Sequence, residues 1–183
     1  MPGQYSTQGP VIDASIAMIR NLALTETITS TTPTPVTVFD GPPGGANIPQ
    51  VFIAIGGQDT NDPIPDGNED WSYLGAMGRY ERYDIVGHVY AFVGGDDNLG
   101  QTGPSDAQAT ARAQVTAIMQ AIEAGYLADV SLSNENGGDQ LVIWAYVQRV
   151  KLQQTTANDS EASKGRWCQA DFTVNVYNTL TVP

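Results

Sequence analysis

The chain has 183 residues, of which 41% are hydrophobic and 15% charged, so it is long and apolar enough for one globular domain with its own core. Its 20 acidic and 8 basic side chains give a formal net charge of −12, which argues against a protein that grips nucleic-acid phosphates. Cys168 is the single cysteine, so an intrachain disulfide is excluded.

The N-terminal part of the sequence predicts one helix and two strands. Pro10 suits the first position of a helix that runs to Ala23. One apolar stripe of this helix is formed by Ile12, Ile16, Ile19 and Ala23. Val36–Phe39 indicates a short strand, and the mostly apolar run Gln50–Ile55 is typical of a buried strand.

The middle of the chain predicts an acidic loop over residues 57–70, a long strand and a second helix. Arg79–Val93 alternates, with Arg82, Asp84 and His88 on one face. Its apolar face consists of Tyr83, Ile85, Val89, Ala91 and Val93. The helix that follows has an apolar side formed by Ala111, Val115, Ile118, Met119 and Ile122, and Gly125 is its expected end.

Two further strands complete the predicted fold. Leu141–Leu152 is apolar on both faces at its start, which predicts a central place in the sheet. Arg166–Tyr177 alternates, with Cys168, Ala170, Phe172, Val174 and Val176 inward and Gln169, Asp171, Thr173 and Asn175 outward. The polar segment 153–164 joins these strands as the tip of a long β-hairpin. We expect a single domain over residues 1–183, with a flexible start over residues 1–9. Its predicted fold is α+β, a mainly antiparallel β-sheet with two helices packed on one face.

Catalytic motifs are missing from the sequence. His88, the only histidine, lies within a predicted strand, where a residue of the sheet face is a simpler interpretation than a general base. Cys168 alternates inward with apolar neighbours, which favours a buried structural thiol over a nucleophile. Phosphate-binding glycine loops, nucleophile elbows and His/Cys metal-ligand sets do not occur. We therefore expect neither enzymatic activity nor a cofactor.

The acidic loop offers the one candidate for metal chemistry. Carboxylates are calcium ligands, and five of them fall close together: Asp59, Asp62, Asp66, Glu69 and Asp70. The EF-hand spacing fails, because Pro63 and Ile64 stand where an acid or amide and a glycine are required. A solvated or partner-facing loop is the leading interpretation. The alternatives are a calcium-dependent binding module and a hydrolase that uses two of these carboxylates.

Three blocks of residues carry a family signal. The first is Val38–Pro43 followed by Val51–Gly57, the second is Gly78–Asp97, and the third is Gly165–Val176. In this order, over residues 10–180, they resemble the tail terminator proteins of long-tailed (siphovirus-type) bacteriophages of actinobacteria.

The resemblance implies a structural virion protein of the tail and neck, assembled in the host cytoplasm. Such a protein forms a homo-oligomeric ring, usually a hexamer, that caps the tail tube and ends its polymerisation. Its partners would be the tail tube protein and a head-completion (neck) protein, and DNA would pass through the lumen without specific binding. Within this class, a head-closure protein or a tail tube protein is the alternative.

No transmembrane run and no signal peptide are apparent in the sequence, which agrees with assembly in the host cytoplasm. The acidic loop and the hairpin tip depart from the family pattern, which makes them the expected partner-facing segments. Their candidate contact residues are Asp59, Asp62, Asp66, Glu69, Asp70, Asn158, Asp159, Glu161 and Lys164.

Overall fold

The computed structural model describes residues 7–26, 32–44, 48–56, 72–73, 78–94, 106–157 and 165–181. Two long helices and a short 3-10 turn, Asn134–Asn136, accompany the strands. The helices are α1 (Gln8–Asn21) and α2 (Asp106–Ala128). The strands are β1 (Thr25–Glu26), β2 (Thr34–Pro35), β3 (Thr37–Asp40), β4 (Val51–Ile55), β5 (Ser72–Tyr73), β6 (Gly78–Gly94), β7 (Trp144–Ala157) and β8 (Gly165–Thr181).

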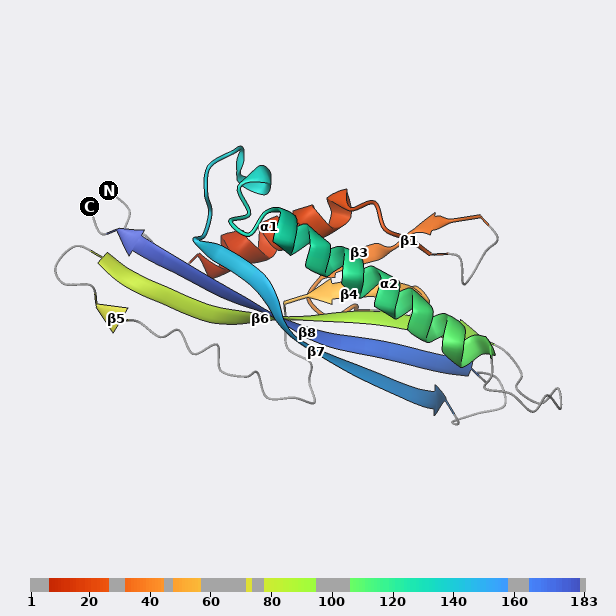
Figure 1. Cartoon of the computed structure of the whole chain (residues 1–183). Helices are drawn as coiled ribbons and strands as arrows, with labels where there is room; N and C mark the ends of the chain where they lie inside the picture. Colours follow the sequence, from red (N-terminus) through yellow and green to blue (C-terminus); the bar gives the residue numbers. More distant parts are fainter. Residues whose placement is uncertain are drawn as a thin grey trace.

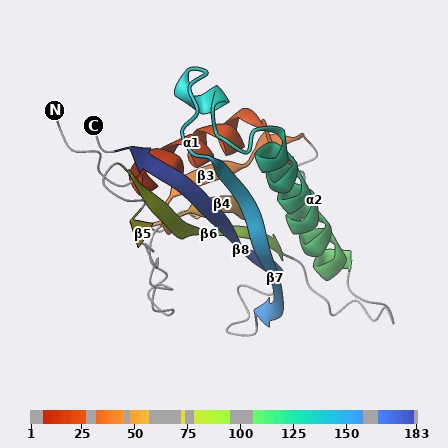
Figure 2. The ribbon, with the colours of Figure 1, turned by 60° about the vertical axis from the view of Figure 1, so that its left-hand side comes forward.

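One twisted sheet forms the centre of the described structure. Its strand order is β3-β4-β6-β8-β7, and β5 pairs with β6 beside this path. The pair β3–β4 is parallel, whereas the other pairs of this sheet are antiparallel. Both helices lie against the same face of the sheet (Figures 1 and 2). The predicted α+β fold, with two helices on one face of a mainly antiparallel sheet, is confirmed.

The core lies between the helices and the inward side chains of β6 and β8. As predicted, these side chains are no more than 3% exposed: Tyr83, Ile85, Val89, Ala91, Cys168, Ala170, Phe172, Val174 and Val176. Val93 is only partly buried. The predicted side of α2 packs onto them through Ala111, Val115, Ile118, Met119 and Ile122. Alternation of apolar residues along the strands therefore defines which face the helices cover.

A buried carboxylate ties α1 to β6. Glu81 lies on the inner face of β6 and is fully buried. Its two carboxylate oxygens each accept a hydrogen bond of 3.1 Å from the backbone N–H of Thr7, the residue before α1. The Thr7 hydroxyl donates to the same carboxylate at 2.6 Å and lies 3.0 Å from the hydroxyl of Tyr83. A negative charge is favourable at a helix N-terminus, so this contact fixes where α1 begins on the sheet.

Three sequence expectations for the strands need correction. Leu141–Leu152 does not supply a central strand, because β7 is at the edge of the sheet. The start of β7 is apolar on both faces because Ala145 is buried in the core on one side and Trp144 stacks on Tyr177 on the other. Residues 153–157 belong to β7 and not to the predicted hairpin tip, because β7 continues to Ala157. Asn175 points outward as predicted but is only 3% exposed.

The helix expectations also need two corrections. Gly125 does not end the second helix, which continues to Ala128. A Cβ at Gly125 would lie 3.4 Å from the side chains of Leu22 and Met18, so the glycine permits close approach of α1 and α2. Ala23 is exposed and lies beyond α1, at a φ of 50°, and Ile12 is only partly buried. The remaining buried positions of α1 are Val11, Ala14, Ser15, Ile16, Met18 and Ile19.

Gly87 is required at the centre of the sheet. It pairs directly with Phe172, and a Cβ at this position would lie 2.3 Å from the tip of the phenylalanine ring. The ring is buried and cannot move aside without displacing its neighbours. We predict that Gly87→Ala lowers the free energy of unfolding by about 1–3 kcal/mol, measured by chemical denaturation.

The matched control is Gly9→Ala in α1, where nothing lies within 4 Å of the added Cβ. Alanine favours a helix over glycine, so this variant should be unchanged or up to about 1 kcal/mol more stable. Equal destabilisation by the two substitutions would contradict the role of Phe172.

Candidate functional site

The predicted contact and calcium residues lie outside the described residues. This holds for Asp59, Asp62, Asp66, Glu69 and Asp70 of the acidic loop and for Asn158, Asp159, Glu161 and Lys164 of the hairpin tip. Among the residues that the structure describes, no group of three or more His, Cys, Asp or Glu side chains could hold a metal ion. The candidate site therefore comes from elsewhere on the fold.

The side of the sheet that faces away from the helices is the candidate site. We call it the open face, and its residues follow from the strand register. In one row across the sheet, His88 of β6 lies opposite Asp171 of β8, which lies opposite Lys151 of β7. A second row joins Arg82 to Tyr177 and Trp144 in the same way. Directly paired residues of antiparallel strands share a face, so these side chains form one continuous surface.

Asp171 holds a polar cluster at the middle of the open face. Nδ1 of His88 lies 2.7 Å from one oxygen of the Asp171 carboxylate, and both side chains are about one-quarter exposed. Gln169 donates to the same oxygen, and Gln153 donates to the other. Partial burial acts to raise the pKa of Asp171, but these hydrogen bonds and the charge of His88 outweigh it, so the pKa lies below its ordinary value.

A hollow of about 160 Å³ opens beside this cluster. Its lining consists of Pro42, Pro43, Phe52, Ala54, Gly56, His88, Tyr90 and Gln169. A His–Asp pair resembles two members of a hydrolytic triad, but that chemistry also needs a nucleophile. The described lining contains no serine, threonine or cysteine, and the Cys168 thiol is fully buried, on the inner side of β8. Burial also raises the pKa of that thiol, which agrees with the predicted structural role.

Aromatic rings in contact with one another cross the open face in two groups. One group runs over four strands, with successive contacts between Phe39, Phe52, Tyr90 and Trp167. Their ring centroids are 5.0–6.0 Å apart. The other group joins Tyr80, Tyr177, Trp144 and Tyr146 at 5.1–5.5 Å. Most of these rings are partly exposed and Tyr146 is 37% exposed, whereas Phe52 is only 9% exposed. The partly exposed rings are the ones that a partner can contact.

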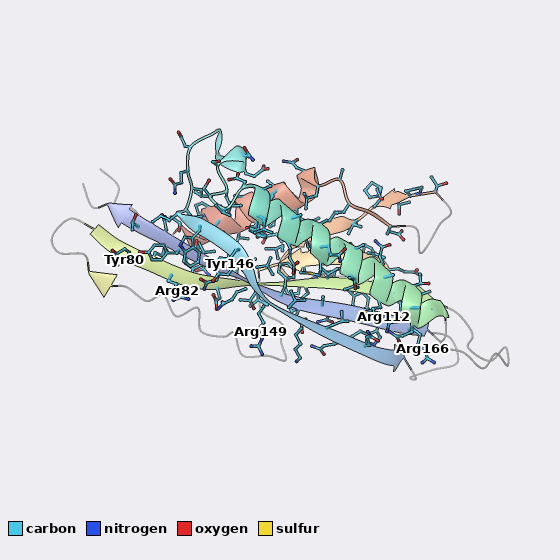
Figure 3. All side chains as sticks on the ribbon, in the orientation of Figure 1. Tyr80, Arg82, Arg112, Tyr146, Arg149 and Arg166 are labelled. Carbon is cyan, nitrogen blue, oxygen red and sulfur yellow. The ribbon has the colours of Figure 1, made fainter. Side chains whose placement is uncertain are left out.

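Basic side chains also gather on the open face. Arg82, Arg149 and Lys151 are exposed there, and none makes an ion pair or hydrogen bond within the described segments. Figure 3 shows Arg82 and Arg149 on the side away from α2, whereas Arg112 and Arg166 lie toward the end where α2 begins. On the same face, Asn175 donates to the carboxylate of Asp84, and the other amide atom of Asn175, Oδ1, is buried without a partner in the described part of the chain.

The two edges of the sheet differ. At β3, the guanidinium of Arg20 donates to the carbonyl oxygen of Val38, which covers part of that short edge. At β7, Val150 and Leu152 are 43% and 45% exposed on the helix side. A strand of 14 residues that carries exposed apolar side chains at an edge is suited to contact with another chain.

Sequence reasoning placed His88 and Asp171 on the outer face correctly but did not bring them together. The signal that was missed is alternation itself, because the outward positions of β6 and β8 include many aromatic residues. The outward positions of β7 add Arg149 and Lys151 to Arg82 of β6. No protein-family model and no curated protein matches the chain. Within the described residues, no helix has both the length and the apolar character needed to cross a membrane.

Acid should weaken the Asp171 cluster. A lowered pKa in the folded state means that the stabilisation is complete above about pH 4, the ordinary value for Asp, and is lost as pH falls through the lowered pKa. We predict that Asp171→Asn is less stable than wild type at neutral pH and that the difference shrinks below about pH 4, measured by denaturation at several pH values.

Asp13→Asn serves as the control, since Asp13 is exposed on α1, far from this cluster in the fold. It should follow the wild-type profile. If Asp171→Asn kept the full wild-type dependence on pH, the cluster would not be the source of the acid sensitivity.

Proposed function

We propose that the chain is a ring-forming structural subunit, the tail terminator of a long-tailed bacteriophage. It caps the tail tube, ends its polymerisation and joins the tail to the neck proteins. The observation that carries this proposal is the open face, a large sheet surface without helices that is rich in aromatic and basic side chains. Aromatic residues and arginine are enriched in protein–protein interfaces.

The segments that resemble tail terminators are neighbours in the sheet. Val38–Pro43, Val51–Gly57, Gly78–Asp97 and Gly165–Val176 contribute β3, β4, β6 and much of β8. These are four successive neighbours in the sheet, so the resemblance covers one connected part of the fold. The exposed apolar pair Val150 and Leu152 lies next to it on β7.

Rival functions have less support among the described residues. A tail tube subunit is expected to have a sandwich of two sheets, whereas this chain has one large sheet and two helices on it. A head-closure protein stays an alternative in the same class. A hydrolase built on His88 lacks a nucleophile in the described lining of the hollow. A calcium-binding module or a carboxylate hydrolase would depend on the acidic loop, which lies outside the described residues.

Mass measurement combined with electron microscopy tests the proposal. We expect closed rings of one stoichiometry, six by resemblance, either in solution or on purified tail tubes, and immunogold label at the head-proximal end of the tail. A chain that stays monomeric under both conditions and is absent from particles would exclude this function. Stabilisation against heat by calcium would instead favour the binding module.

The contribution of the β7 edge to ring formation can be tested in the same assay. Val150→Thr combined with Leu152→Thr places a β-branched residue at both strand positions but removes apolar surface, so ring formation should weaken by about tenfold. Leu127→Gln on α2, where the leucine is 73% exposed, is the control and should assemble like wild type. Equal loss in both variants would indicate a general effect on folding.

A further inference from the structure

We infer that the open face docks the acidic segment Asp59–Asp70 of a second copy of this chain. The inference rests on the proposed ring and assigns the contact between neighbouring subunits. It is argued from charge on the open face, from the aromatic residues beside that charge, and from the composition of the segment.

In the described part of the chain, the open face carries more basic than acidic side chains, although the chain as a whole is acidic. Its strands contribute three exposed basic residues, Arg82, Arg149 and Lys151, none of which has a partner among the described residues. Two carboxylates lie on the same face, and both accept hydrogen bonds from neighbouring strands, Asp84 from Asn175 and Asp171 from His88. Among the described residues, the basic side chains of this face outnumber its carboxylates three to two, a balance that suits contact with acids from another molecule.

Aromatic side chains lie beside one of these basic groups, Arg82. Arg82 lies opposite Tyr177, which stacks on both Tyr80 and Trp144. Residues that dominate binding energy at protein interfaces are most often Trp, Tyr and Arg, and this part of the open face contains all three. The partner we expect is thus a protein segment with carboxylates and backbone to lie against the rings.

The chain itself supplies a segment of complementary charge. Residues 59–70 contain five acidic and no basic side chains. A duplex nucleic acid would also offer negative charge, but the net charge of −12 repels it, and three basic groups are few for phosphate binding. Because the open face and the acidic segment are different surfaces, the contact can repeat head to tail from one copy to the next, the kind of contact that closes into rings.

Charge reversal on either side of the contact tests the inference. The face variant carries Arg82→Glu, Arg149→Glu and Lys151→Glu, and the segment variant carries Asp59→Lys, Asp62→Lys and Asp66→Lys. Self-association is measured by sedimentation at low and high ionic strength, with the full chain in every case. Arg112→Glu, an exposed position on α2, is the control for a changed net charge.

We expect wild type and Arg112→Glu to associate, and more weakly at high ionic strength, because exposed ion pairs are screened by salt. Each triple variant alone should associate at least about tenfold more weakly, since like charges then meet at the contact. An equimolar mixture of the two triple variants should recover association, because each supplies the charge that the other now needs.

Three results would overturn the inference. The face variant could form rings as wild type does, in which case the proposed function stands and the docking fails. Association could return only when all six substitutions share one chain, which would mean that the segment meets its own open face. Finally, wild type could retain labelled duplex DNA at low salt while the face variant does not, which would make the open face a nucleic-acid site.

A synthetic peptide of residues 57–71 separates docking from ring formation. Binding of this peptide to the wild-type chain, but not to the face variant, would support the docking even if the chain remained monomeric, in which case the proposed ring would fail alone. Equal binding to both chains would contradict the docking whatever the oligomeric state.

Discussion

The unbroken antiparallel pairing of β6 with β8 is the constraint on which the rest of the structure depends. Seventeen residue pairs run from Gly78 opposite Thr181 to Gly94 opposite Gly165. Because side chains alternate along both strands, this register decides at once which residues enter the core and which stay on the open face. A shift by one residue would move Phe172 out of the core and bring Asp171 into it.

On each face of the sheet, this register leaves one glycine position with no room for a side chain. On the inner face, Phe172 occupies the space that a side chain at Gly87 would need. On the open face, the ring of Phe92 covers Gly165 in the same manner, 2.3 Å from where a Cβ would stand. Glycine opposite or beside a large ring lets the strands remain close while the aromatic side chain covers the exposed backbone. The two long strands therefore specify their own alignment.

The sequence predicted what depends on local periodicity and missed what depends on distant partners. Alternation located β6 and β8 and most of their inward residues, because burial of one face leaves a period of two in the sequence. The edge position of β7 could not be predicted in this way, because the stacking of Trp144 on Tyr177 makes an edge strand look apolar on both faces. Glu81 is an acidic residue at an inward position of β6. Its burial is explained only by the hydrogen bonds from Thr7, which lies 74 residues earlier in the chain. Gly125 looked like a helix end because glycine is common there, whereas its neighbours in the fold are Met18 of α1 and Leu22 directly after α1. The predicted site residues lie outside the described structure, whereas the open face appears only when three strands are brought side by side.

Oxidative footprinting tests most directly whether the open face is the surface by which this chain assembles. Hydroxyl radicals modify exposed aromatic side chains, so the free chain and the assembled particle can be compared residue by residue. We predict that Trp144 and Tyr146 become protected on assembly, while Leu127, exposed on α2, reacts equally in both states. Protection of Leu127 together with unchanged reaction at Trp144 and Tyr146 would show that the helix side makes the contact and would contradict the central claim.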